Sequence, residues 1–140
     1  MAVLHCVLSS PEGTVFQTDA RSVVVPAVDG ELGILPRHAP LIGLLGVGEL
    51  RIEPSGKEGS KEGEKVRYFL QGGFVEVLEN QVTILATQVE SLETLTREEA
   101  DAMVQTLLAD RPDSRQSFEV RDAHAEKVRV ARLRAKLSRG

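Results

Sequence analysis

Residues 29–42 read Asp-Gly-Glu-Leu-Gly-Ile-Leu-Pro-Arg-His-Ala-Pro-Leu-Ile, and they restrict the backbone more tightly than any other stretch of the chain. Asp29-Gly30 is typical of a tight turn with positive φ, and Gly33 suits a close approach between backbones. Pro36 and Pro40 exclude a continuous helix or a central strand. Two interpretations follow: a structural turn, or a rigid loop that presents side chains to a partner.

Turn-forming residues are concentrated in the first half of the chain, where eleven of the twelve glycines and five of the six prolines precede residue 75. This distribution predicts short strands separated by turns. The expected strands are Val3–Leu8, Val15–Thr18, Ser22–Pro26, Gly48–Ile52, Val66–Gln71, Phe74–Leu78 and Val82–Gln88. We expect Gly72-Gly73 to interrupt one run and Asn80-Gln81 to form the turn that follows. The pattern indicates an antiparallel β-sandwich or barrel.

The segment from residue 54 to residue 65 consists of polar side chains, glycines and one proline, with nearly balanced charges. Because this composition offers no apolar surface to bury, the segment is predicted to be a mobile hairpin loop. We assign it no partner.

The C-terminal third of the chain has a longer apolar period, which predicts helices instead of strands. Thr96 and Glu99 have the spacing of a capping box, in which each side chain bonds the backbone of the other residue. One apolar stripe follows at helical spacing: Ala100, Met103, Val104, Leu107 and Leu108. A second helix is expected over residues 117–138. The helices would pack on each other or on the sandwich. The change of period near residue 95 divides the chain into a β-sandwich domain at 1–94 and a helical hairpin at 95–140.

The composition limits the class of protein. A chain of 140 residues supports one compact core with an appendage, and 41% apolar residues are typical of a globular protein. The single cysteine, Cys6, excludes an internal disulfide and fits a reducing compartment as a small apolar side chain. No apolar run approaches the length of a membrane span, and the N-terminus lacks the layout of a signal peptide. A soluble, cytoplasmic protein without direct membrane insertion is expected.

Catalytic and metal-binding patterns are missing from the sequence. The histidines His5, His38 and His124 are far apart, and none has a second ligand at metal-binding spacing. His38 could serve as a general base, but no nucleophile elbow, phosphate-binding glycine loop or pair of carboxylates accompanies it. We therefore expect no catalytic residue, no metal and no cofactor. A hydrolase that uses His38 is the least supported hypothesis.

The last fourteen residues carry six basic side chains and no acidic one, although the whole chain has a net charge of −4. These cations could form a solvated helix face that complements the helix dipole. They could instead bind an acidic protein surface, which would make the association sensitive to salt. A nucleic-acid partner is not expected, because aromatic residues are not interleaved with the cations and the whole chain is acidic.

Four segments carry a family resemblance: the run 29–42, Ser22-Val23-Val24-Val25-Pro26, the Gly48-Glu49-Leu50 turn, and Gly72-Gly73-Phe74-Val75-Glu76-Val77. Together they resemble the epsilon subunit of bacterial F-type ATP synthase, the equivalent of the mitochondrial delta subunit. The resemblance is specific over residues 3–95, and beyond them it depends on the two-helix layout. It implies a ten-stranded β-sandwich followed by a C-terminal helical hairpin.

The resemblance implies a non-catalytic subunit of the central stalk. The chain would lie peripherally on the cytoplasmic face of the inner membrane, as part of a proton- or sodium-translocating ATP synthase. Its partners would be the gamma subunit and the membrane rotor ring of c subunits. The residues expected to contact them are Asp29, Gly30, Glu31, Leu32, Gly33 and His38. Arg37 stands where the family commonly has glycine.

The resemblance also implies that the hairpin restrains ATP hydrolysis when it extends into the catalytic head of alpha and beta subunits. The basic residues that would meet an acidic loop of beta are Arg129, Arg132, Arg134 and Lys136. Some family members bind ATP at this hairpin through Leu or Ile, Asp, two variable residues, Arg and Ala. Here Thr96 replaces the aspartate and Glu99 replaces the arginine, so strong ATP binding is not expected.

An alternative from a different functional class is a free-standing β-sandwich adaptor whose basic helix binds an acidic protein surface. An adaptor of this kind would not retain a gamma subunit, whereas a central-stalk subunit would. Retention of gamma therefore distinguishes the two hypotheses.

Overall fold

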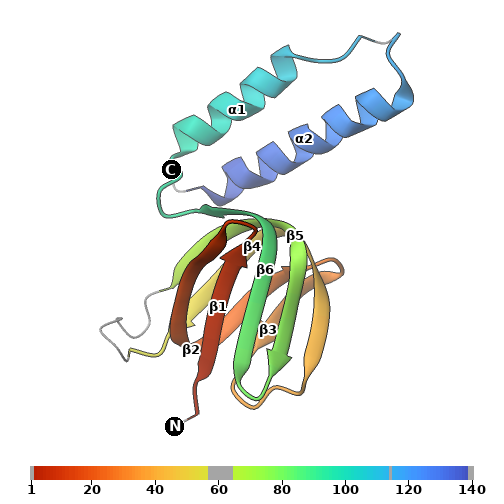
Figure 1. Cartoon of the computed structure of the whole chain (residues 1–140). Helices are drawn as coiled ribbons and strands as arrows, with labels where there is room; N and C mark the ends of the chain where they lie inside the picture. Colours follow the sequence, from red (N-terminus) through yellow and green to blue (C-terminus); the bar gives the residue numbers. More distant parts are fainter. Residues whose placement is uncertain (1, 57–64, 114, 139–140) are drawn as a thin grey trace. The chain divides into compact units, whose positions relative to one another are not determined.

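The computed structural model of the protein describes residues 2–56, 65–113 and 115–138. The chain divides between Ser91 and Leu92 into two compact units, a sheet unit and a helical unit (Figure 1). The polar loop expected over residues 54–65 falls mainly on residues 57–64, which lie outside the described residues.

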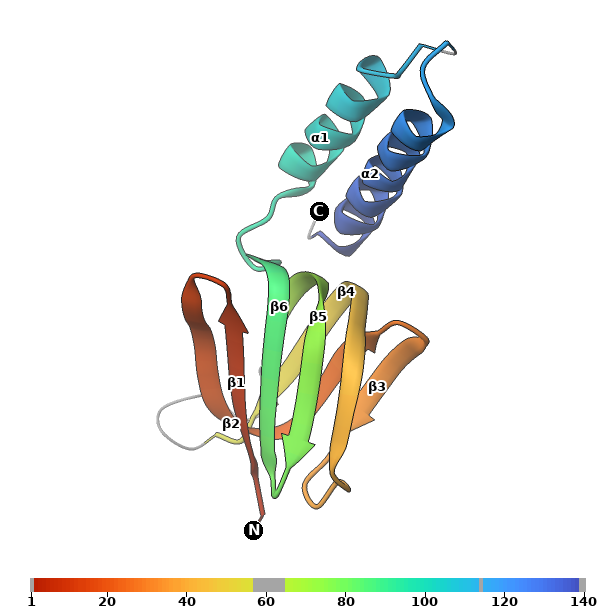
Figure 2. The ribbon, with the colours of Figure 1, turned by 45° about the vertical axis from the view of Figure 1, so that its right-hand side comes forward.

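The described part of the sheet unit contains six strands: β1 (Leu4–Ser10), β2 (Gly13–Ala27), β3 (Gly30–Ile34), β4 (Leu41–Pro54), β5 (Val66–Leu78) and β6 (Gln81–Ser91). Their order is β1-β6-β5-β4-β2-β3, and a further pairing between β1 and β2 closes five of them into a ring. β6 lies between β1 and β5 (Figure 2). β1 pairs with β6 in parallel, and the other pairings of the described strands are antiparallel. The expected β-sandwich followed by two helices is confirmed, with one parallel pair that the turn pattern did not predict.

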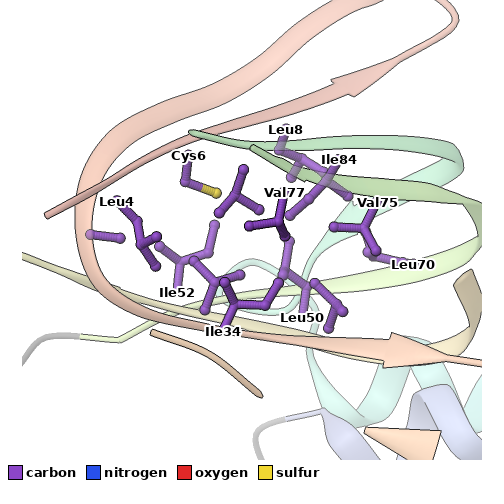
Figure 3. Packing of buried hydrophobic residues seen from close by; sticks show 14 of the residues in the cluster. Leu4, Cys6, Leu8, Ile34, Leu50, Ile52, Leu70, Val75, Val77 and Ile84 are labelled. Atoms are coloured by element: carbon purple, nitrogen blue, oxygen red, sulfur yellow. The ribbon is translucent and has the colours of Figure 1, made fainter. Parts of the chain in front are cut away.

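The core of the sheet unit is built from side chains that alternate inward along these strands (Figure 3). Leu4, Cys6 and Leu8 show the alternation on β1, where all three are fully buried. Burial raises the pKa of the Cys6 thiol to about 12, so Cys6 stays protonated and serves as a small apolar side chain, as expected. Valine, leucine and isoleucine side chains complete most of the cluster: Val23, Val25, Ile34, Leu45, Leu50, Ile52, Leu70, Val75, Val77, Val82 and Ile84.

Two of the observed strands each join two strands that the sequence pattern predicted separately. β2 runs through both of the strands expected at 15–18 and 22–26, and its register against β4 shifts along the way. β5 continues through Gly72 and Gly73, which have φ values of +73° and +121°. Because glycine has no Cβ, it accepts such angles within a strand, and β5 stays paired with both neighbours. In the described residues, six strands therefore take the place of the ten that the resemblance implied.

The turn expected at Asp29-Gly30 lies one residue earlier in the chain. Val28 and Asp29 connect β2 with β3, whereas Gly30, with a φ of +128°, already pairs with Ala27 as the first residue of β3. The close approach expected at Gly33 is wrong, because a Cβ atom there would meet no atom within 4 Å beyond its chain neighbours. Gly33 is simply a residue of β3, a strand that the sequence pattern did not predict.

The helical unit contains α1 (Arg97–Ala109) and α2 (Phe118–Leu137), which pack against each other. α1 begins after Thr96, whose hydroxyl oxygen accepts a hydrogen bond from the Glu99 amide at 3.2 Å, as expected for a helix cap. Ser117 caps α2 through an equivalent bond to the amide three residues later. Both helices therefore begin where the sequence predicts them.

The apolar stripe of α1 is only partly buried. Ala100 and Val104 are buried, but Met103 is 47% exposed, so its expected place in the packed stripe is wrong. The buried residues of α2 are the alanines Ala131 and Ala135. These side chains are short, and Met103 of α1 keeps about half of its surface exposed, 47%.

Candidate functional site

A short loop between β3 and β4 carries His38, one of the expected contact residues. The His38 amide donates a hydrogen bond to the Leu35 carbonyl at 3.2 Å, and the ring atom Nδ1 lies 2.7 Å from the Ala39 carbonyl oxygen. Because a carbonyl can only accept, Nδ1 carries the proton, and Nε2 is then an acceptor in the neutral ring. The half-buried imidazole thus has one fixed tautomer and one fixed direction.

The other expected contact residues lie together on the β2–β3 hairpin. Asp29 lies in the turn, and Gly30, Glu31 and Gly33 occupy exposed positions on β3. Leu32 is half-buried and packs against the core. The structure therefore groups five of the six residues on one hairpin and places the sixth on the loop that follows it.

Glu31 is tied to the sheet by an ion-pair network that the sequence analysis did not predict. Arg51 Nη1 on β4 lies 2.8 Å from a Glu31 carboxylate oxygen and 2.8 Å from a Glu49 carboxylate oxygen. Arg67 Nε on β5 donates to the other Glu49 oxygen at 2.6 Å. Burial raises the pKa of Glu49, but hydrogen bonds from Arg51 and Arg67 outweigh burial, so the net shift is downward.

Part of this network had a signal in the sequence. Glu49 and Arg51 are two residues apart in a strand, and side chains at that spacing point to the same face. Their partners Glu31 and Arg67 come from other strands, so the contacts depend on the register between strands. The charge alternation along β4 could have indicated a polar face, but it could not have named the partners.

An apolar row crosses three strands on the outside of the sheet. Leu44 on β4 pairs in register with Phe74 on β5, and Phe74 pairs with Leu85 on β6. Their exposed fractions are 61%, 52% and 44%. Ile42, two residues before Leu44 on β4, is 76% exposed. Exposed apolar side chains gathered in this way mark a contact surface.

The four basic residues expected to act in the helical unit do not share one face of α2. Arg129, Arg132 and Lys136 are exposed and occupy positions i, i+3 and i+7, which form one face of a helix. Arg134 is half-buried and lies on a different face. Arg129 Nε donates to Glu126 at 2.9 Å, and this hydrogen bond lowers the pKa of the Glu126 carboxyl group.

A cleft of about 440 Å³ lies between the C-terminal end of α1 and α2. Arg111, Arg129 and Arg132 contribute to its lining. His124 Nε2 donates to the Leu107 carbonyl at 2.6 Å and so joins the two helices. Among the described residues, no group of histidine, cysteine and carboxylate side chains could hold a metal ion. Within the same part of the chain, no helix is both long and apolar enough to span a membrane.

The family model of the beta-sandwich domain of the ATP synthase delta/epsilon chain matches residues 3–92. The chain belongs to the ATP synthase delta/epsilon family. One relative, the ATP synthase epsilon chain of Desulfitobacterium hafniense, is 41% identical over 127 residues, or 90% of each chain. Another, the ATP synthase epsilon chain of Alkalilimnicola ehrlichii, is 32% identical over 146 residues, which cover 99% of this chain and 100% of the relative.

Two solved structures have a similar fold. A chain of the Euglena gracilis mitochondrial ATP synthase (OSCP/F1/c-ring) gives a TM-score of 0.78 at 21% identity, with 95% of this chain and 79% of that chain covered. A chain from the central stalk/c-ring of the Tetrahymena thermophila mitochondrial ATP synthase gives 0.65 at 15% identity, with 97% and 96% covered. At such identities the likeness shows the fold alone. The resemblance seen in the sequence is confirmed by the family match, and the delta/epsilon chain is a non-catalytic subunit of the ATP synthase.

Proposed function

We propose that the protein is a central-stalk subunit of an F-type ATP synthase, which couples the gamma subunit to the membrane rotor ring and restrains ATP hydrolysis through its C-terminal helices. Residues 1–94 would bind the stalk, and residues 95–140 would form the inhibitory element. The complex would hold the chain peripherally at the cytoplasmic face of the membrane. The observation that carries the proposal is the exposed apolar row of Leu44, Phe74 and Leu85 in a delta/epsilon chain.

The apolar row suits attachment to gamma. Its three side chains lie in register across β4, β5 and β6, so they form one continuous surface. A fully buried side chain of this size contributes about 1.5–3 kcal/mol, and these half-exposed ones would each contribute about half of that. An attachment of this kind is not weakened by salt, because salt screens charges and leaves apolar contacts in place. A rotor joint needs such a persistent contact.

The β2–β3 hairpin and the loop with His38 are the proposed contacts with the rotor ring and gamma. Asp29 is exposed at the tip of the hairpin, and Glu31 is oriented by its ion pair with Arg51. A side chain that is already ordered loses less conformational entropy when a partner binds. These residues are therefore suited to polar contacts that fix the orientation of the subunit on the ring.

The helical unit has the properties of an element that changes partners. Met103 and Phe118 are 47% and 73% exposed, so apolar surface remains available to a partner. The exposed face of Arg129, Arg132 and Lys136 suits an acidic loop in the catalytic head of alpha and beta subunits. The hairpin could switch between a folded-back arrangement and one that extends into the catalytic head. A difference of a few kcal/mol in free energy between the two arrangements is sufficient for such a switch.

ATP binding at the hairpin is not part of the proposal. The Thr96 hydroxyl is engaged as the cap of α1, and Glu99 would place a negative charge beside a triphosphate. A submillimolar dissociation constant for ATP and the isolated chain would contradict this expectation.

Truncation after Thr94 tests the inhibitory role. The complex reconstituted with the truncated chain is expected to hydrolyse ATP faster than the complex with the full chain, while gamma remains bound. Unchanged ATPase activity would exclude inhibition by the hairpin and leave the coupling role in place. Failure of the full chain to retain gamma would instead favour the free-standing adaptor.

A matched pair of substitutions tests the attachment to gamma. Leu85 and Val15 have similar exposed fractions, 44% and 43%, but Val15 lies on β2, outside the apolar row. We expect Leu85→Glu to weaken gamma binding about tenfold or more, because it buries a charge in the apolar contact. Val15→Glu is the control and should leave the dissociation constant unchanged. Equal binding by both variants would exclude the apolar row as the gamma contact.

A further inference from the structure

Asn80 connects three segments at one end of the sheet unit. It forms the β5–β6 turn with Glu79, one residue earlier than the turn expected at Asn80 and Gln81. Its backbone carbonyl accepts a hydrogen bond from the His5 amide at 2.7 Å. Its side-chain oxygen Oδ1 accepts one from the Arg37 amide at 2.6 Å, across 43 residues of sequence. Asn80 therefore joins the start of β1 and the loop before β4 to one turn.

Arg37 and Asn80, the two residues that this hydrogen bond joins, both have left-handed backbone conformations, with φ values of +70° and +64°. Asparagine tolerates this conformation, whereas for an arginine it costs about 1–2 kcal/mol. A strained residue of this kind persists only where its surroundings hold it. The bond from the Arg37 amide to Asn80 Oδ1 is such a restraint, and it acts on the residue directly before His38.

The other hydrogen bonds of the loop are local. The His38 amide bonds the Leu35 carbonyl, and its ring bonds the Ala39 carbonyl, so both bonds stay within residues 35–40. Local bonds shape the loop, and its two ends continue into β3 and β4. The bond to Asn80 adds a third link to the sheet, because the β5–β6 turn joins two strands that pair with each other.

We propose that Asn80 is a positioning residue, which holds residues 35–40 in the one arrangement that presents His38 to the rotor. This inference rests on the proposed central-stalk function. Asn80 would act through Arg37 and would itself need no contact with gamma or the ring. The role depends on its side-chain oxygen rather than on the turn as such.

Three variants distinguish the role of the Asn80 side chain from the role of the turn backbone. Asn80→Gly keeps a backbone that accepts positive φ, and its carbonyl can still bond the His5 amide, but the acceptor for the Arg37 amide is removed. Asn80→Asp tolerates the same backbone and retains an acceptor oxygen. Glu79→Gly is the matched control, because Glu79 is the neighbouring left-handed residue with a φ of +48°.

Amide hydrogen exchange in the full-length chain measures the restraint directly. Asn80→Gly is expected to speed exchange of the Arg37 amide by about tenfold or more, because its hydrogen-bond partner is lost. Asn80→Asp and Glu79→Gly should remain close to the wild-type rate. Unchanged exchange in Asn80→Gly would overturn the inference.

Binding to a complex of gamma and the c ring tests the consequence. Asn80→Gly is expected to raise the dissociation constant about threefold to tenfold, and Asn80→Asp to restore it, since disorder in the loop must be removed on binding. Wild-type affinity in Asn80→Gly, despite a freed Arg37 amide, would overturn the positioning role. Failure of the wild-type chain to bind would instead overturn the proposed function, and the exchange rates would still decide whether Asn80 orders the loop.

Discussion

A Cβ atom placed on Gly73 would lie 1.9 Å from the carbonyl oxygen of Leu85, well inside van der Waals contact. Gly73 sits in the middle of β5 and pairs with Leu45 on one side and Ala86 on the other. The strand therefore passes so close to β6 that it excludes every side chain at this position. The close pairing of β5 with β6 therefore requires glycine at position 73.

We expect Gly73→Ala to lower the free energy of unfolding by about 3–5 kcal/mol, the sum of backbone strain and steric overlap. Gly30→Ala is the control, because Gly30 has a similar φ of +128° but open space around it. It should lose only about 1–2 kcal/mol, the strain of the left-handed region. Urea denaturation of both variants measures the difference, and equal losses would show that the contact with Leu85 does not matter.

Arg37→Gly is expected to leave the protein as stable as the wild type or up to about 1 kcal/mol more stable. Arg37 has a φ of +70°, and relief of this strain outweighs the added flexibility of the unfolded chain. Arg37→Ala retains a Cβ atom and should give no such gain. Thermal unfolding of the two variants provides the test, and a clear loss of stability in Arg37→Gly would contradict the expectation.

Glu49 should make the sheet unit more stable above its ordinary pKa of 4.5 than below it. The folded-state pKa is lowered, so the contribution of Glu49 is fully present above 4.5 and is lost as the pH falls through the folded value. Glu49→Gln is expected to cost about 1–3 kcal/mol at neutral pH, because two charge-assisted hydrogen bonds are weakened. The difference in free energy of unfolding between wild type and Glu49→Gln, measured by urea denaturation, should become smaller in acid. A difference that is constant with pH would contradict this assignment.

The exposed face of α2 should carry the inhibitory contact. Arg132→Glu combined with Lys136→Glu is expected to raise ATPase activity of the reconstituted complex about twofold to fivefold. The loss of exposed ion pairs with an acidic loop would weaken the inhibitory contact by up to about 1 kcal/mol. Arg134→Glu is the control, because Arg134 is half-buried on a different face. If Arg134→Glu has the larger effect on activity, α2 meets its partner through another face.

Helix boundaries could be predicted because their signals are local. Thr96 and Ser117 bond amides within three residues, and no other part of the fold is needed for those bonds. Contacts between side chains of different strands were harder to predict, because they depend on which strands are neighbours. The pairing of Glu31 with Arg51, for example, reaches across β2, which lies between β3 and β4.

The first half of β4 was missed for a different physical reason. Its glycines suggest turns, but in the structure they allow strands to approach each other. A Cβ atom on Gly48 would lie 2.9 Å from the Cβ atom of Pro26, and one on Gly46 would lie 3.2 Å from the Ala27 carbonyl oxygen. Both contacts are with β2, so these glycines are packing residues. A single sequence does not distinguish the two uses of glycine.

The parallel pairing of β1 with β6 also determines when the sheet unit can fold. β1 is made first and can pair with β2 at once, but its second edge waits for β6, the last strand of the unit. Contacts between such distant segments slow folding, because a long loop must close before they form. We expect the ring to close on the ribosome only after β6 has emerged. The helical segment, which follows β6, would then act during synthesis as the tether that carries the last strand out of the exit tunnel.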